Sequence, residues 1–361
     1  MVSVDPVIRE RLIRLTVLPG WVVLAAATLA FTAGLSLPLE YQFVPLVASV
    51  VLFGLPHGAV DHLAPTRVRG LSPTVRSLAT VGVLYGVVGG LYGLLWFVTP
   101  VAAFALFILV TWLHWGQGDV HSLVALLGVA HLVTRGQRIL TALARGTLPM
   151  LVPLVFFPEQ YRFVAETIVG LFGASTLGPV SAVFTPTGRL AVALLVGGLL
   201  VASLLVGVAR AERLGDSRRG WYLDAAEVGL LVAFFATVPP LLAVGLYFTV
   251  WHALRHIGRL VAIDPRTRAA LADGRYGATL ARFARDSAPL TAASLVFLGA
   301  LSVLVPATPA GLPELVSLYL VFIAALTLPH VLVVVWLDRE QGVWTDRTPL
   351  LVERANTNGR L

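Results

Sequence analysis

The sequence predicts an all-α fold, a polytopic bundle of about eight to ten transmembrane helices that forms one integral membrane domain over residues 1–361. The first reason is composition, because 57% of the residues are hydrophobic and 12% are charged, against about 25% charged residues in a typical soluble domain. The second is that long apolar runs recur along the chain. The third is that arginine is concentrated in alternate connections between these runs. Together they indicate a multi-pass protein of the cell membrane, in contact with the lipid bilayer.

The apolar runs define the expected spans, since about 20 apolar residues cross about 30 Å of hydrocarbon as a helix. The runs lie at residues 15–36, 42–62, 78–98, 100–117, 138–157, 187–209, 221–238, 240–259, 287–306 and 313–337. The apolar pieces 120–134 and 164–184 are short or interrupted by glycine, so we expect half-buried or interfacial helices there. Residues 260–286 are more polar, and we expect a cytoplasmic loop that holds a short amphipathic helix.

Charge orients the bundle and excludes one class of partner. All 26 basic residues are arginine, and the formal net charge is +7. The turns at 37–41, 99–100 and 307–312 contain no arginine, whereas the connections between them and both terminal stretches do. Because short cytoplasmic loops collect positive charge, we expect both termini in the cytoplasm. The positive charge is then explained by loops that face the membrane, and no nucleic-acid partner is expected.

Histidines inside the apolar runs are the candidate functional residues, because ionisable side chains are costly in lipid. They occur in "GLPHGAVDH" with His57, Asp61 and His62, "TWLHWGQGD" with His114 and Asp119, "VWHALRH" with His252 and His256, and "LTLPHVLVVVW" with His330. The first three motifs lie at similar distances from the expected cytoplasmic ends of their spans. Antiparallel packing therefore predicts that His57, His114, His252 and His256 meet at one depth, where they can bind a metal.

The donor atoms narrow the choice of metal. The chain has no cysteine, which excludes thiolate zinc sites, iron–sulfur clusters and disulfides. Neutral imidazoles suit iron, copper, zinc or nickel. A non-haem Fe(2+) that keeps an open position for O2 is chemically sensible, while copper and zinc stay open. His252 and His256 share one helix face, and as separate groups in lipid they would need two acceptors, which favours a role as metal ligands.

The other polar residues of these motifs have competing interpretations. A bond to the carbonyl of a neighbouring helix explains His330 as well as metal binding does. Asp61 and Asp119 either end their helices or hold the imidazole N–H of a ligand. The remaining histidines are expected to pack against helices or to face solvent or lipid headgroups: His62, His121 and His131.

Aromatic residues gather near the same histidines. They are Trp112, Trp115, Tyr247, Phe248 and Trp251. One interpretation is an aromatic belt at the membrane interface. The other is an apolar slot beside the metal that grips a long conjugated ligand by stacking. Spacing along the sequence does not separate the two.

Four stretches carry a resemblance to a known family. "GLPHGAVDH", "HWGQGD", "HALRHIGRL" and "LPHVLVVVWLD" resemble the signature blocks of the Brp/Blh family, in the family's order and across nearly the whole chain. The resemblance implies a membrane-embedded Fe(2+) dioxygenase that splits beta-carotene with O2 at its central double bond into two molecules of retinal. It also implies His57, His114, His252 and His256 as the iron ligands, and a functional link to a rhodopsin.

Other classes of membrane protein compete with this interpretation. A di-iron hydroxylase needs about eight histidine ligands in tight clusters, whereas this chain has 8 histidines in total and one HxxxH motif. An intramembrane zinc protease needs HExxH, which is absent. A bis-histidine haem protein, a transporter, and an accessory or carrier protein for carotenoid or retinal stay open as alternatives.

Overall fold

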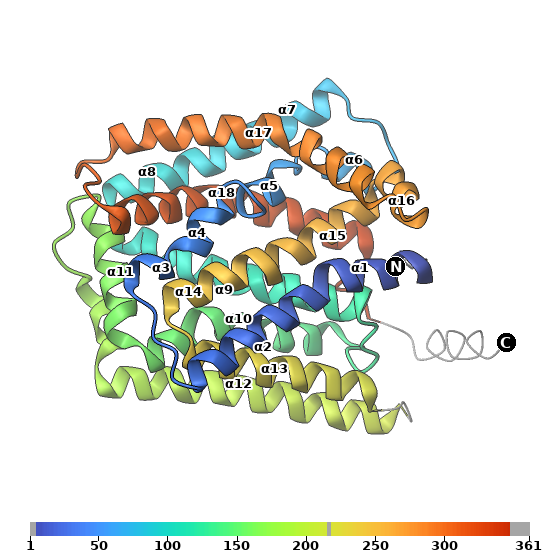
Figure 1. Cartoon of the computed structure of the whole chain (residues 1–361), viewed down its shortest axis with the longest axis horizontal. Helices are drawn as coiled ribbons and strands as arrows, with labels where there is room; N and C mark the ends of the chain where they lie inside the picture. Colours follow the sequence, from blue (N-terminus) through green and yellow to red (C-terminus); the bar gives the residue numbers. More distant parts are fainter. Residues whose placement is uncertain (1–4, 215–217, 347–361) are drawn as a thin grey trace.

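The computed structural model describes residues 5–214 and 218–346, and within these ranges the chain folds into helices without any strand (Figure 1). Nine of the described helices are long and apolar enough to cross a membrane. Span by span they are α1 (Pro6–Leu12), η1 (Ile13–Val17) and α2 (Leu18–Thr32); α3 (Leu39–Gln42), α4 (Val44–Ser49) and α5 (Gly54–Ala59); α7 (Val75–Leu84), η2 (Tyr85–Gly89) and α8 (Gly90–Val98); α9 (Pro100–His121) and η3 (Ser122–Leu126); α10 (Arg135–Phe156); α12 (Pro186–Arg213); α13 (Arg219–Thr237); α17 (Tyr276–Leu304); and α18 (Leu312–Gln341). The predicted all-α polytopic bundle is confirmed.

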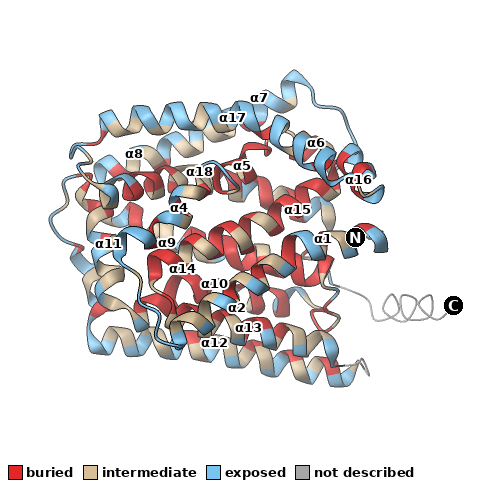
Figure 2. Cartoon of the chain, in the orientation of Figure 1, coloured by how far each residue is buried: buried red, intermediate tan, exposed pale blue. Residues whose placement is uncertain are grey.

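The predicted span at 240–259 forms the central helix of the bundle. It consists of α14 (Pro240–Leu246), η5 (Tyr247–Ala253) and α15 (Leu254–Ile263), which follow one another without a break. Most of its residues are buried, and it runs through the middle of the bundle in Figure 2. A helix that is surrounded by protein needs no lipid-facing side, so it can carry histidine and arginine. This explains why the central helix is more polar than the nine candidate membrane-spanning helices.

The first helix begins at Pro6 instead of residue 15, the predicted start. The Asp5 side chain caps it by accepting a hydrogen bond of 2.9 Å from the backbone N–H of Val7. Proline in the first turn and aspartate before it are the residues expected at a helix start. The polar turns that precede the apolar run are therefore helical, and Arg9 among them donates to the carbonyl of Leu126 at 2.6 Å.

The expected half-buried helix at 120–134 is wrong. Residues 120–126 continue the fourth span through η3, and a loop follows at 127–134. Val120, Leu123 and Leu132 are buried in one apolar cluster there. The apolar residues serve internal packing against α10, so this piece is core and not interface. The same expectation of a half-buried helix agrees better with the structure at 164–184. There α11 (Pro158–Gly170) and the 3-10 helix η4 (Gly178–Phe184) are partly exposed.

The expected loop at 260–286 is shorter than predicted. The short helix in it is α16 (Pro265–Ala272), but α17 already begins at Tyr276, well before residue 287. The charged residues in this early part are paired. Asp286 accepts from Arg67 of α6 (Ala64–Arg67) at 2.5 Å, and Arg282 donates to Asp264 at 2.6 Å. Ion pairing lets a helix continue through a polar sequence where hydropathy alone ends the span.

The two ends of the described chain lie at the same end of the bundle (Figure 1). Helix α1 and the last turns of α18 both reach this side, together with α6 and α16. This agrees with ten crossings, because an even number returns the chain to the side on which it starts. The cytoplasmic location of that side stays a prediction, which reporter fusions to either terminus can test.

Candidate metal centre

Five histidine side chains converge in the interior of the bundle. They are His57 of α5, His114 of α9, His252 of η5, His256 of α15 and His330 of α18, and all are buried. The ring centroid of His330 lies 5.0 Å from that of His57 and 4.8 Å from that of His114. It also lies 5.1 Å from that of His256, and the centroid of His252 is 4.8 Å from that of His114. The structure thus brings the four predicted ligands together and places His330 among them.

Glycines allow the histidine-bearing helices to approach closely. A Cβ atom at Gly54 would lie 2.8 Å from the ring of Phe248, so α5 passes η5 at this distance only with glycine. A Cβ atom at Gly116 would lie 1.9 Å from the carbonyl oxygen of Ala142, which holds α9 against α10. Close backbone approach is the role that small residues play between membrane helices. The imidazoles meet because the backbones behind them touch.

Two of the imidazoles are oriented through their Nδ1 atoms. Nδ1 of His57 bonds the carbonyl oxygens of Gly54 and Phe53, the latter at 3.2 Å. Nδ1 of His330 bonds a carboxylate oxygen of Asp61 at 2.7 Å. Metal-binding histidines commonly donate one ring N–H to a carbonyl or carboxylate, which leaves the other nitrogen free for the metal. Both side chains have this arrangement.

The remaining ring nitrogens lack partners. Among the described residues, Nε2 of His252, His256 and His330 and both ring nitrogens of His114 make no hydrogen bond. Leaving one buried polar group unpaired costs about 1–3 kcal/mol, so several in one place need an explanation. Neutral imidazoles that converge from different helices fit a divalent transition metal, whose binding would pair one nitrogen of each ring. The residues present therefore fit the predicted metal.

Asp61 lies beside this cluster and adds a second set of donors. One ligand atom from each of Asp61, His256 and His330 can be chosen so that all lie within 4.8 Å of one another. The oxygen of Asp61 that bonds His330 also accepts from the hydroxyl of Tyr85 at 2.5 Å, and its other oxygen makes no hydrogen bond. The sequence suggested that Asp61 holds an imidazole. The imidazole that it contacts is His330, which is 269 positions away.

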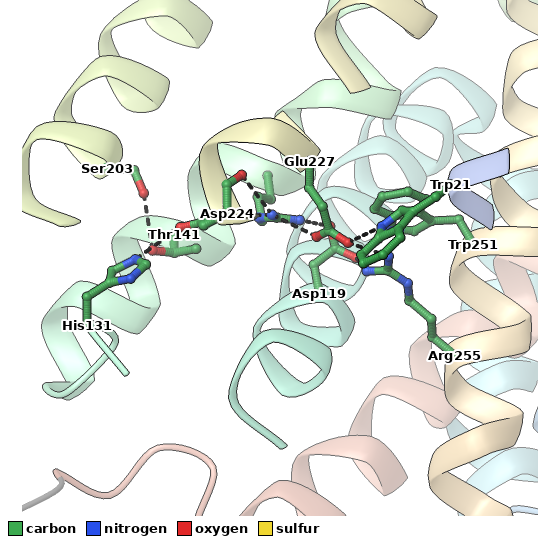
Figure 3. A network of polar contacts seen from close by, with 10 residues as sticks. Trp21, Asp119, His131, Thr141, Ser203, Asp224, Glu227, Trp251 and Arg255 are labelled. Carbon is green, nitrogen blue, oxygen red and sulfur yellow. Dashed lines mark hydrogen bonds and ion pairs between the residues drawn. The ribbon is translucent and has the colours of Figure 1, made fainter. Parts of the chain in front are cut away.

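Asp119 contacts other partners than the expected imidazole. Its carboxylate accepts from Nε1 of Trp251 at 2.9 Å and pairs with Arg145 at 2.9 Å. These contacts account for both of its oxygens. In the described part of the chain Asp119 therefore belongs to a network of charges, which is shown in Figure 3.

This charge network consists of three carboxylates and two arginines, all buried. Arg145 pairs with Asp119, with Asp224 at 2.8 Å and with Glu227 at 2.9 Å. Arg255 pairs with Glu227 at 2.6 Å. Buried charges are stable only when they are paired and hydrogen-bonded. Because its members come from α9, α10, α13 and α15, the network ties the central helix to three neighbours (Figure 3).

Three further side chains complete the network. Trp21 of α2 donates to Glu227 at 2.6 Å, and Nε2 of His131 lies 3.1 Å from a carboxylate oxygen of Asp224. The guanidinium of Arg255 lies over the ring of Trp251 at 3.7 Å. Arg145, Asp224, Glu227 and Arg255 are not among the site residues predicted from the sequence. The signal was present, since each is a charged residue inside a predicted apolar span.

An apolar cavity begins at the histidine cluster. It has a volume of about 110 Å³ and is lined at one end by His57, His114, His252 and His330. Its other lining residues are almost all apolar, from α4, α9, α10, α11, α14 and α18. Apolar cavities with a few convergent polar groups are typical ligand sites, because the apolar walls bury the ligand and the polar groups orient it. The cavity therefore offers an elongated apolar molecule a place that ends at the candidate metal centre.

Four of the five predicted aromatic residues form two groups, and Trp112 lies apart from both. Trp115 and Phe248 line the cavity, with their rings nearly parallel at 20° and their centroids 6.2 Å apart. Tyr247 and Trp251 are fully buried behind it, where they stack on each other. Trp112 donates to the carbonyl of Leu143 at 2.7 Å. Four of the five are buried within the bundle, which argues against an interfacial belt for them.

The remaining histidines lie apart from the cluster. His62 bonds the carbonyl of Ala59 at 2.9 Å, and partial burial lowers its pKa. His121 is buried and lines a separate polar cavity with Arg259, near the end of the bundle that holds the termini. The expectation that His131 packs against a helix is met through its contact with Asp224.

Comparison with known proteins identifies the family. The sequence model for beta-carotene 15,15'-dioxygenase matches residues 48–338. A protein of Halobacterium salinarum named "Probable beta-carotene 15,15'-dioxygenase Blh" is 48% identical over 93% of this chain and 95% of its own length. From the same species, "Probable beta-carotene 15,15'-dioxygenase Brp" is 34% identical over 89% of this chain and 90% of its own.

A more distant relative comes from an uncultured marine bacterium. The protein named "Beta-carotene 15,15'-dioxygenase" from that source is 25% identical over 58% of this chain and 66% of its own length. No solved structure matches the chain significantly. The matched region contains all five clustered histidines. The chain belongs to the beta-carotene 15,15'-dioxygenase family, as its histidine motifs predicted.

Proposed function

We propose that this protein is a beta-carotene 15,15'-dioxygenase of the cell membrane, with one non-haem Fe(2+) bound by His57, His114, His252 and His256. The observation that supports this most is the convergence of buried imidazoles with unpaired nitrogens at the end of an apolar cavity. The names of the relatives supply the substrate, and the donor set suits iron. Bound Fe(2+) with an open position supplies the activation of O2 that attack on a double bond requires.

The roles of the chain's own residues follow from their contacts. The carbonyls of Gly54 and Phe53 hold the ring of His57 through Nδ1, which leaves Nε2 for the metal. Trp115 and Phe248 present nearly parallel rings to the cavity, against which a flat polyene can stack. The apolar walls take the carotenoid from the bilayer and exclude water. A water-insoluble substrate then never has to leave an apolar environment.

The overall reaction needs no acid, base or reductant from the protein. Both atoms of O2 are added to the two carbons of one C=C bond, that bond is broken, and each carbon becomes an aldehyde. No proton is taken up or released in the sum, and the electrons come from the broken double bond. This agrees with a site in which the chain offers imidazoles and apolar walls, and in which no serine or cysteine nucleophile is required.

Expression in a carotenoid-producing host tests the proposal. We expect beta-carotene to disappear from the extract and retinal to appear, and the purified protein to contain about one iron per chain. His114→Ala is the negative control, with membrane abundance measured in parallel. Carotenoid that is bound but unchanged would instead support a carrier, and a Soret band in the absorption spectrum would support a bis-histidine haem protein.

A further inference from the structure

The cavity follows three helices in one direction away from the histidine cluster. Its lining residues run from Phe104 to His114 on α9 and from Leu320 to His330 on α18. On the central helix they run from Pro240 to His252. At 1.5 Å rise per residue, the first two stretches give a depth of about 15 Å. On each helix the histidine is at or next to the C-terminal end of the lined stretch, so the cluster lies at one end of the cavity.

Buried apolar side chains line the opposite end. Leu46 of α4 and Leu241 of α14 belong to one buried cluster there. Phe104 of α9 and Ile168 of α11 belong to another. All four are buried, so this part of the lining is packed. We call Leu46, Phe104, Ile168 and Leu241 the cavity floor.

The depth of the cavity is comparable with one half of an extended beta-carotene molecule, a substituted cyclohexene ring with its polyene arm. The floor is apolar, as this ring is. Because the substrate is symmetric about its central double bond, binding one half at a fixed depth is sufficient to position that bond. The other half does not have to be recognised for the choice of bond to be correct.

We propose that the cavity floor selects the bond that is cleaved, by stopping the ring of one half of the carotenoid so that the central double bond lies at the histidine cluster. This inference rests on the proposed function. A polyene that slid one double bond deeper would press its ring into the floor. One that stopped one double bond short would leave an empty space there. An apolar site discriminates about 10–200-fold for each methylene of misfit, so a packed floor suffices for selection.

Truncation of the floor tests this inference. Ile168→Ala and Leu241→Ala deepen the cavity, and we expect asymmetric pairs of longer and shorter apocarotenals to rise about tenfold or more relative to retinal. Filling the floor with Ile168→Phe is expected to slow turnover of beta-carotene, because the central bond no longer reaches the cluster. The measured quantity is the ratio of asymmetric to symmetric products, which does not depend on the amount of folded enzyme.

Leu154→Ala is the matched control. Leu154 is buried in the same apolar cluster as Ile168 but does not line the cavity, so its truncation loosens packing without deepening the cavity. We expect this variant to form only retinal. If the unmodified enzyme forms retinal and the floor variants also form only retinal, the floor does not select the bond. If the unmodified enzyme forms no aldehyde at all, the proposed function itself is wrong.

Discussion

The histidine cluster and the charge network share helices and differ in one respect. His114 and Asp119 both lie on α9, and His256 is adjacent in sequence to Arg255 on α15. In the cluster, several buried nitrogens have no partner within the described chain. In the network, every carboxylate oxygen accepts a hydrogen bond or ion pair. Burial of polar groups alone therefore does not identify a ligand site. What marks the cluster is that unpaired imidazole nitrogens from several helices converge in one place, whereas the unpaired Nε and Nη1 of Arg255 in the network belong to a cation that is paired with Glu227.

The largest effect is expected from removal of a single imidazole of the cluster. His256→Ala or His252→Ala should abolish retinal formation and iron binding, since one ligand is lost while the helix remains packed. His121→Ala, outside the cluster, should keep activity within about tenfold, or about 1.4 kcal/mol on the barrier. Retinal yield, iron content and membrane abundance of the three variants check this. Near-normal cleavage by His256→Ala at normal abundance would replace the four-histidine site by one that includes His330.

Substitution of a residue in the charge network should lower the stability of the protein. Glu227→Gln leaves Arg145 and Arg255 incompletely compensated in the interior, and breaking a buried pair costs about 3–5 kcal/mol of unfolding free energy. Thermal unfolding in detergent should show the loss. Glu10→Gln is the control, because Glu10 pairs with Arg14 at the surface at 2.6 Å, where about 0–1 kcal/mol is expected. Equal stability of the two variants would mean that the network does not brace the bundle.

Asp61 tests whether His330 acts at the metal. Asp61→Asn removes the carboxylate that holds Nδ1 of His330, and loss of such a contact typically lowers metal affinity about 10–100-fold. Iron retained against a graded chelator measures this directly, without reference to turnover. Asp273→Asn changes a carboxylate in an exposed pair and should leave retention unchanged. Unaltered retention in Asp61→Asn would show that the contact of Asp61 with His330 does not support the metal.

The smallest effect concerns Asp264, outside the spans. Burial alone would raise its pKa, but the hydrogen bond from Arg282 and the charge of Arg67 outweigh this and hold the pKa below its usual value. Its contribution to stability is thus present above the unfolded pKa of about 3.9 and is lost as pH falls through the folded value. Asp264→Asn should be less stable than the unmodified protein at pH 7, with the difference shrinking below about pH 4. A difference independent of pH would contradict this origin.

Sequence reasoning succeeded where distance along one helix decides the outcome. Apolar length predicted the spans, and the distance of His57, His114 and His252 from their helix ends predicted a common depth. It failed where contacts between side chains distant in sequence determine the helix boundaries and the burial of charges. The pairing of Arg67 with Asp286 explains the early start of α17, and that of Arg145 with Asp224 explains charges in apolar spans. Hydropathy reports how long a helix is, but it does not report which helix lies beside it.

The π-helical segment η5 makes the central helix sensitive to changes in chain length. A π turn bonds residue i to i+5, so it holds one residue more than an α turn. Deleting one residue between Val244 and Tyr247, with the π turn kept, would rotate the preceding half by about 100° relative to His252. The cavity wall formed by Leu241 and Val244 would then face elsewhere, while both histidines kept their places. A single-residue gap at this point is thus a route by which a related enzyme could keep its metal and change its substrate.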